Sequence, residues 1–195
     1  ASEALVQAGV PVLAVTLDVA EETQWQAAVQ QAVERFGKIH MLVNNAGVAG
    51  GAGPMERQSS DDWHWSVSVN LMGVVFGAKT VVPLIKEHGE GGWIVNVGSM
   101  AGMGGVPFSG AYTATKSAVV ALSESWAGEF KGDGINVSVL CPAFVQTRIY
   151  DSQRNRQARY QSEGTAASDA SDVADKAKAA VQNGIDASIV GKRLV

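Results

Sequence analysis

Apolar runs that alternate with helical patterns are the feature that most restricts the fold of this chain. Helices are predicted over 21–36, 60–87 and 110–130, and Gly37, Gly89 and Gly132 follow them. Alternation of this kind predicts an α/β fold: a doubly wound parallel sheet in three α/β/α layers, as in Rossmann folds. We read residues 1–195 as part of a single such domain, with strands predicted at 12–17, 39–43, 93–97 and 135–140.

Polar residues and glycines follow these strands at the points where each one ends. Asp18-Val19 follows the first strand, Asn44-Asn45-Ala46-Gly47 the second, Gly98-Ser99 the third, and Pro142 comes just after the fourth. In open α/β sheets, ligands bind beyond the carboxyl ends of the strands. The sequence therefore predicts one binding site at this edge of the sheet.

A tyrosine and a lysine point to proton-transfer chemistry at that edge. Tyr112 and Lys116 are four positions apart in the predicted helix, so they share one face, and Ser99 precedes the tyrosine by thirteen residues. An ammonium group favours a nearby phenolate, so Lys116 is expected to lower the pKa of Tyr112 from its ordinary value near ~10. A chance Tyr-x-x-x-Lys pair is expected in about one such chain in eight, so the pair gains its weight from the other motifs.

Taken together, these motifs resemble the short-chain dehydrogenase/reductase superfamily in its single-domain form, from about Ala4 to about Val195. The resemblance implies catalytic roles for four residues. The serine, Ser99, orients the substrate oxygen, and Tyr112 exchanges the proton. Lys116 lowers the pKa of the tyrosine and binds the nicotinamide ribose, and Asn70 holds a water in the proton relay.

The same resemblance implies a cofactor, NAD or NADP, and assigns residues to it. The sequence does not distinguish the two nucleotides, because the strand end that selects between them is not within these residues. Tyr112 and Lys116 are implied to bind the nicotinamide ribose. The other implied contacts are Asp18 and Val19 at the adenine, Asn44, Ala46 and Gly47 near the adenosine ribose, and Pro142, Ala143, Val145 and Thr147 beside the nicotinamide carboxamide.

Two departures from the family pattern stand out. Ala143 occupies the place of a glycine after Pro142, and no Thr-Gly-x-x-x-Gly-x-Gly turn for the pyrophosphate is found. The glycine-rich runs 50–53 and 102–105 have the wrong context for that turn. We therefore expect the functional polypeptide to be longer than these residues, with the first strands and helices and the last helix and strand outside them.

The substrate positions lean apolar. The segment 149–170 is polar and has the length of a lid or a mobile segment. By resemblance it is the substrate loop. A bulky or aromatic alcohol is therefore expected rather than a small charged one, contacted by Ser99, Met100, Val106, Phe144, Ile149 and Tyr150.

Composition excludes several other classes. With 15 basic and 19 acidic residues the chain gives no electrostatic reason to bind nucleic acid, and its longest apolar stretch is interrupted by Lys79 and Pro83, which argues against a membrane span. Cys141 is the only cysteine, which suits a reducing cytoplasm. The three histidines, His40, His64 and His88, lack metal-ligand spacing, so no metal is expected.

The favoured hypothesis is an NAD(P)-dependent oxidoreductase acting on a secondary alcohol or ketone. The alternative is a non-catalytic subunit or fragment that has lost dinucleotide binding, prompted by the missing turn and by Ala143. An epimerase or dehydratase is disfavoured because no large C-terminal substrate domain is found within these residues. The resemblance also implies a homodimer or homotetramer, formed through the long helix and the helix of Tyr112 and Lys116.

Overall fold

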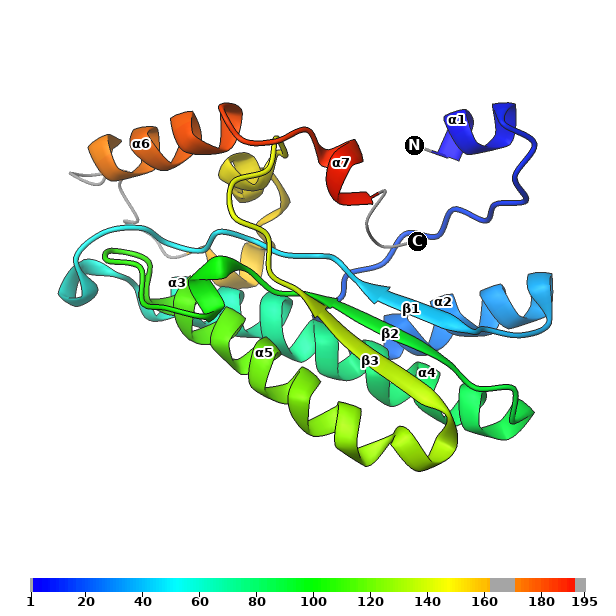
Figure 1. Ribbon diagram of the computed structural model, residues 1–195. Helices are drawn as coiled ribbons and strands as arrows, with labels where there is room; N and C mark the ends of the chain where they lie inside the picture. The colour runs from blue at the N-terminus through cyan, green and yellow to red at the C-terminus, as the bar shows by residue number, and fades with distance from the viewer. Residues whose placement is uncertain (1, 162–170, 192–195) are drawn as a thin grey trace.

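The centre of the computed structural model, which describes residues 2–161 and 171–191, is a parallel sheet of three strands (Figure 1). The strands are β1 (Met41–Asn44), β2 (Gly92–Val97) and β3 (Ile135–Leu140), and they pair in that order. Asn44 lies opposite Asn96, and Val97 lies opposite Leu140. The three strands therefore end together, as a shared binding edge requires.

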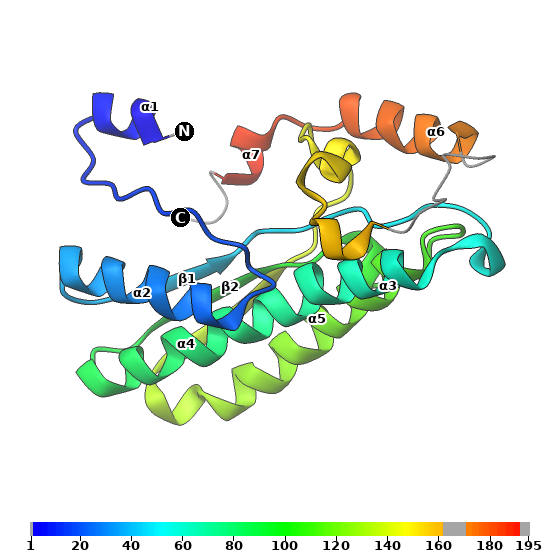
Figure 2. The same cartoon turned by 180° about the vertical axis from the view of Figure 1, so that it is seen from behind.

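One face of this sheet is covered by the helices α2 (Glu22–Phe36), α4 (Gly73–His88) and α5 (Gly110–Glu129), as Figures 1 and 2 show from opposite sides. Apolar side chains that recur along these helices meet the inward side chains of the strands. This burial supplies most of the driving force for folding and holds the three helices against the sheet. Its buried members are Trp25, Val29, Leu42, Ala78, Val81, Val82, Ile85, Ile94, Phe130 and Ile135.

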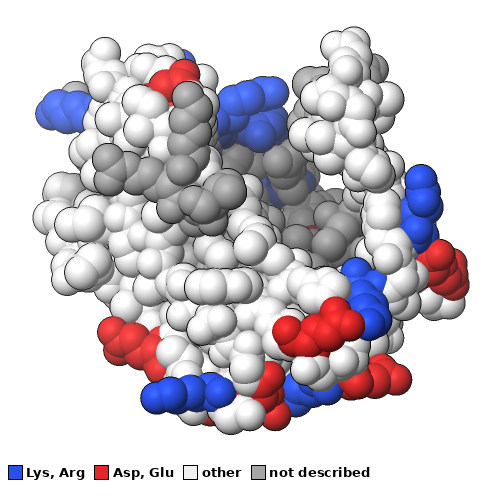
Figure 3. Space-filling view, turned by 45° about the vertical axis from the view of Figure 1, so that its right-hand side comes forward, with Lys and Arg blue, Asp and Glu red and all other residues white. Residues whose placement is uncertain are grey.

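The opposite face of the sheet is open within the described residues. Met41, Val43 and Trp93 are between 43% and 49% exposed, although all three lie in strands. Most of the acidic side chains in view in Figure 3 lie in the lower half of the face shown. The described residues thus provide the sheet and one of the two predicted helical layers.

A single helix was predicted over 60–87, and the structure divides it into three parts. These are α3 (Ser60–Val67), a π-helical turn (Ser68–Met72) and α4, which ends at Gly89 with a positive φ of 68°. Ser59 caps the start, because its side chain accepts a hydrogen bond from Asp62 N while the Asp62 side chain accepts one from Ser59 N. A π turn inside an α-helix often marks a functional position, and this one contains Asn70.

The predicted strand at 12–17 is wrong, because these residues form no strand in the structure. A strand needs a hydrogen-bonded neighbour, and β1, β2 and β3 pair only with one another in the described part. The apolar pattern of 12–17 therefore does not place this segment in the sheet.

The remaining elements are short and lie mostly outside the sheet-and-helix core. Residues 149–161, which were expected to be a loop, contain two 3₁₀ helices, Ile149–Asn155 and Ala158–Tyr160. The rest of that segment, 162–170, lies outside the described residues. The other elements are α1 (Ser2–Gln7), α6 (Ser171–Gln182), α7 (Ala187–Gly191) and the 3₁₀ turns Met55–Arg57, Met100–Gly102 and Lys131–Asp133.

The continuous helix from Ser60 to His88 is long and apolar enough to cross a membrane by those two measures alone. Half of its most apolar window is buried inside the protein. Val81, Val82 and Ile85 belong to the core beneath the sheet. Core packing therefore accounts for the apolar character of this helix.

Candidate active site

The end of β2 places Ser99 at the binding edge. Gly98 N donates to Leu140 O at 2.8 Å, and Met100 N donates to Pro142 O at 3.0 Å, so the segments after β2 and β3 are tied together on either side of the serine. Its Oγ accepts a hydrogen bond from Ala101 N at 3.2 Å, which leaves the hydroxyl proton to be donated.

Tyr112 and Lys116 reach this serine from the first turns of α5. The Tyr112 phenol is hydrogen-bonded with the Ser99 hydroxyl. Lys116 Nζ donates to Val97 O at 2.8 Å and lies 5.8 Å from the centre of the Tyr112 ring. The structure thus brings together the three residues that the sequence proposed as a unit.

Burial dominates the electrostatics of this group. It raises the pKa of Tyr112 above its ordinary value, and the hydrogen bond from Ser99 opposes that rise. Burial lowers the pKa of Lys116 to about 8, while the nearby Cys141 thiol acts in the opposite direction. The expectation that Lys116 depresses the pKa of the phenol is wrong for this arrangement, because the ammonium points to the Val97 carbonyl.

Asn70 lies in the π turn and is buried, with 1% of the residue exposed. Its Oδ1 accepts a hydrogen bond from Val48 N at 2.8 Å, and its Nδ2 donates to Val48 O at 3.0 Å and to Thr115 Oγ1 at 3.2 Å. Both N–H donors of the side-chain amide and one acceptor site of its oxygen are therefore occupied. The Asn70 side chain thus joins the Val48 loop to α5.

Gly47 lies between this asparagine and the lysine. A Cβ at this position would lie 3.4 Å from Asn70 Oδ1 and 3.5 Å from Lys116 Nζ. Any side chain here would fill the space in front of Lys116, so glycine keeps the turn open at that point. Of its neighbours, Ala46 is exposed, whereas Asn44 is buried and donates from Nδ2 to Asn96 Oδ1 at 2.9 Å.

Asp18 and Val19 lie at the far side of the same edge, where a different segment already contacts them. Asp18 Oδ2 accepts hydrogen bonds from Gln157 Nε2 at 3.0 Å and Arg159 Nη2 at 3.3 Å. Val19 O accepts one from Trp25 Nε1 at 3.0 Å. Gln157 and Arg159 thus contact Asp18, one of the two residues that the resemblance assigns to adenine.

The segment after β3 is mostly exposed. Val145 forms an isolated parallel bridge with Ile185, and Ile185 N donates to Phe144 O at 3.1 Å. Thr147 Oγ1 accepts a hydrogen bond from Ile149 N at 3.4 Å. Pro142 is half-buried and Ala143 is exposed, so the methyl group in place of the family's glycine meets no crowding.

The proposed substrate side chains are accessible at this edge. Met100 is 51% exposed and Phe144 57%, and both follow strand ends. Ile149 is half-buried, and Lys178 Nζ lies 5.5 Å from the centre of the Tyr150 ring. Exposed apolar groups beside a polar catalytic cluster are typical of ligand sites, and the set also includes Val106, Met103 and Phe108.

Sequence reasoning missed two features of the site. Thr115 directly precedes Lys116 and binds Asn70, yet a buried threonine gives no signal of its own in a sequence. The ion pair of Arg156 and Asp62, at 2.5 Å with side chains 7% and 13% exposed, joins residues 94 positions apart. No spacing rule finds such a pair.

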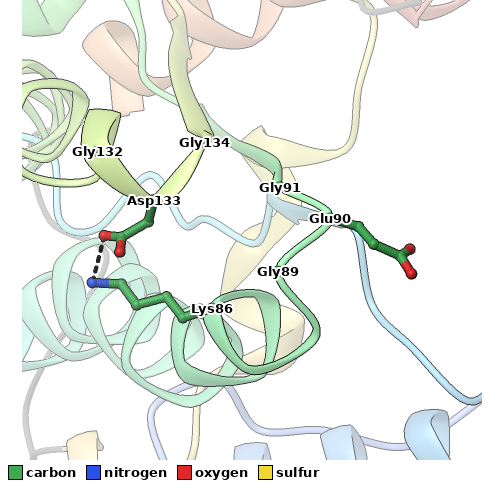
Figure 4. Close-up of a pocket in the computed structure, with 7 residues that line it drawn as sticks. All are labelled: Lys86, Gly89, Glu90, Gly91, Gly132, Asp133 and Gly134. Carbon is green, nitrogen blue, oxygen red and sulfur yellow. Dashed lines mark ion pairs between the residues drawn. The ribbon is translucent and has the colours of Figure 1, made fainter.

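The opposite end of the sheet carries a second cluster of charges. His40 comes together here with His88 and Glu90, which follow it in the sequence by 48 and 50 positions. Lys38 pairs with Glu90. A pocket of about 480 Å³ opens beside Glu90, and it is lined by four glycines and by the charged residues Lys86, Glu90 and Asp133. Figure 4 shows the pocket, with Lys86 paired to Asp133. None of the candidate active-site residues lines it.

Residues 1–158 match the family model of the short chain dehydrogenases, and the chain belongs to this family. The CLA biosynthesis dehydrogenase/reductase of Lactiplantibacillus plantarum is 38% identical over 154 residues, covering 78% of this chain and 54% of that protein. The 3-alpha-(or 20-beta)-hydroxysteroid dehydrogenase of Mycobacterium tuberculosis is 42% identical over 137 residues, covering 70% and 52%. The chain thus spans about half the length of these relatives.

Solved structures of the family share the fold. A short chain dehydrogenase/reductase from Burkholderia phymatum, in complex with NAD, superposes with a TM-score of 0.89 at 38% identity, covering 93% of this chain and 65% of that one. Levodione reductase superposes with a TM-score of 0.73 at 33% identity, covering 78% and 60%. These likenesses confirm the predicted α/β Rossmann fold.

Proposed function

We propose that this chain carries the catalytic groups of an NAD(P)-dependent oxidoreductase that acts on a secondary alcohol or ketone. The observation that carries the proposal is the cluster of Ser99, Tyr112 and Lys116, in which the serine and the phenol are hydrogen-bonded and Lys116 Nζ lies 5.8 Å from the centre of the phenol ring. A scaffold that only binds a partner has no need of a buried lysine beside a half-buried phenol, since removing both from water has a cost.

The residues around Lys116 fit a dinucleotide at its nicotinamide end. The open space at Gly47 lies in front of Lys116 Nζ, which donates to Val97 O and has further protons to donate. Tyr112 and Lys116 would hold the ribose there, and Pro142, Ala143, Val145 and Thr147 would flank the carboxamide. When bound, the nicotinamide ring supplies hydride chemistry that amino-acid side chains lack.

The other end fits through Asp18 and Val19 at the adenine, with Asn44, Ala46 and Gly47 near its ribose. Binding there would exchange the contacts of Asp18 with Gln157 and Arg159 for contacts with the nucleotide. This engagement of Asp18 is also what favours the second candidate, a non-catalytic subunit that no longer binds dinucleotides.

In the proposed reaction, the Ser99 hydroxyl donates a hydrogen bond to the substrate oxygen and so orients it toward Tyr112. During alcohol oxidation Tyr112 accepts the hydroxyl proton as a general base, and during ketone reduction it donates that proton. The charge on Lys116 favours the phenolate whenever a ligand turns the ammonium away from Val97 O. Asn70 keeps the Val48 loop and α5 in register behind this group.

We propose a bulky or aromatic alcohol as the substrate class, supported by the exposed Met100, Phe144 and Tyr150 at the same edge. The hydroxysteroid dehydrogenase of Mycobacterium tuberculosis, 42% identical, is named for a substrate of that kind. A panel on which small charged hydroxy acids are the best substrates would contradict this assignment.

We also propose a homo-oligomer in a reducing cytoplasm. The single cysteine supports the compartment. Of the apolar residues on the two long helices, Val82 and Val119 are buried, and Phe76 and Trp126 pack against the core. These four side chains are therefore occupied within one copy, so an interface would use other residues.

The first experiment is a titration of the purified full-length protein with NADH and with NADPH, followed by nicotinamide fluorescence. Saturable binding of either nucleotide is expected, and it identifies the cofactor. A folded sample that binds neither would move the assignment to the non-catalytic subunit. Tyr112→Phe serves as the matched control, since it should bind the nucleotide and fail in turnover.

A further inference from the structure

Thr115, the residue before Lys116, makes two buried hydrogen bonds at the site and has no role in the proposed reaction. Thr115 is 2% exposed, and its Oγ1 accepts a hydrogen bond from Asn70 Nδ2 at 3.2 Å. The same hydroxyl donates to Tyr112 O at 2.9 Å. One buried group thus connects the π turn of Asn70 to the first turns of α5, which carry Tyr112 and Lys116.

This connection has no substitute among the contacts of Asn70. The asparagine makes its other hydrogen bonds with Val48, at 2.8 and 3.0 Å, and those hold the loop rather than α5. Without the threonine hydroxyl, one N–H of the side chain of Asn70, a residue that is 1% exposed, would have no partner among the described residues. A buried donor left unpaired costs more than a hydrogen bond is worth, so the structure would shift to satisfy it.

We propose that Thr115 is a positioning residue: its hydroxyl aligns the turn of α5 that carries Tyr112 and Lys116 with the asparagine behind them. The inference rests on the proposed function. Small displacements of a proton-transfer group lower turnover strongly, because the reacting atoms must lie within hydrogen-bond reach. Thr115 thus acts through Tyr112 and Lys116 rather than on the substrate.

A second pair in the same helix has the same chemistry and serves as a control. Ser123 Oγ accepts a hydrogen bond from Asn96 Nδ2 at 3.0 Å and donates to Val119 O at 2.7 Å. Ser123 is 2% exposed and Asn96 is fully buried. This pair lies eight residues further along α5, inside the core, so its loss should weaken the fold without touching the catalytic group.

The test compares Thr115→Val, which keeps the shape and removes the hydroxyl, with Thr115→Ser, which keeps the hydroxyl, and with Ser123→Ala. For Thr115→Val we expect kcat to fall about 10- to 100-fold, with a shifted pH profile of kcat and a shifted absorbance titration of the Tyr112 phenol. Thr115→Ser should restore all three. Ser123→Ala should lower the denaturation midpoint and leave kcat within about twofold of wild type.

Two outcomes would overturn the inference. Thr115→Val could lower the denaturation midpoint as Ser123→Ala does while keeping kcat, the pH profile and the phenol titration, or Thr115→Ser could fail to restore them. If the wild-type protein turns over no alcohol with either nucleotide, the proposed function fails. The absorbance titration of the Tyr112 phenol is identified as the signal that Tyr112→Phe lacks. It does not require turnover, so it still decides whether Thr115 positions the tyrosine.

Discussion

The two ends of the sheet treat charge in opposite ways. At the carboxyl ends of the strands, Lys116 is 4% exposed and donates to a backbone carbonyl, and burial lowers its pKa to about 8. At the amino ends, the side chains of Lys38 and Glu90 are each about half exposed and pair directly, and the pKa of Glu90 falls to about 2 because Lys38 and His40 donate hydrogen bonds to it. A charge in solvent costs little free energy, whereas removing a charge from water destabilises the folded protein. Desolvated charges are therefore concentrated at functional sites.

The largest expected effect is at the carboxyl end. Tyr112→Phe should lower kcat by at least about 100-fold, because it removes the group that exchanges the proton, while nucleotide binding measured by fluorescence stays close to wild type. Glu90→Gln at the other end is the control and should keep full turnover. If Tyr112→Phe kept most of the activity, the carboxyl end of the sheet would be no more important for turnover than the amino end.

Next in size is the buried pair of Arg156 and Asp62. Arg156→Met should lower the free energy of unfolding by about 3 kcal/mol, because Asp62 is then left buried without its cation. Its hydrogen bonds from Ser59 keep the loss toward the low end of the usual range. Urea denaturation measures the change. If the loss in the free energy of unfolding were no larger than that for an exposed ion pair, burial would not be what makes the Arg156–Asp62 pair stabilising.

The depressed pKa of Lys116 predicts how stability depends on pH. Between pH 8 and the ordinary lysine value of 10.5, the unfolded chain binds a proton that the folded protein has released. Stability therefore rises with pH through this window, and the desolvation penalty is fully present below it. Relative to Lys116→Met, the wild type should gain about 2 kcal/mol between pH 8 and 10, by urea denaturation at each pH. A flat difference would contradict the buried, charged lysine.

The smallest effect is expected at Glu90. Its pKa is depressed in the folded protein, so its contribution to stability is present above the unfolded value of 4.5 and is lost as the pH falls through about 2. Glu90→Gln should shift the urea midpoint at pH 7 less than any variant above, and salt should reduce the shift further because the pair is exposed. A salt-independent loss as large as that of Arg156→Met would reverse the comparison.

Local patterns were enough to predict the elements that bury their own apolar face. The helices over 21–36 and 110–130 and the strands that became β2 and β3 were all predicted within two residues of their observed ends, since periodicity reports burial directly. The prediction of a strand at 12–17 was wrong because a strand must pair with a neighbouring strand. No residue within the segment specifies that neighbour.

The sequence by itself determined the α/β class and the three residues Ser99, Tyr112 and Lys116, because helical spacing and strand ends follow from local chemistry. Only the tertiary structure decided what surrounds them. It placed the Val97 carbonyl at the ammonium of Lys116, the Thr115 hydroxyl at Asn70, and Gln157 and Arg159 at Asp18. Burial and hydrogen bonds between residues distant in sequence set the charge of a site, and these arise when the packed elements enclose it.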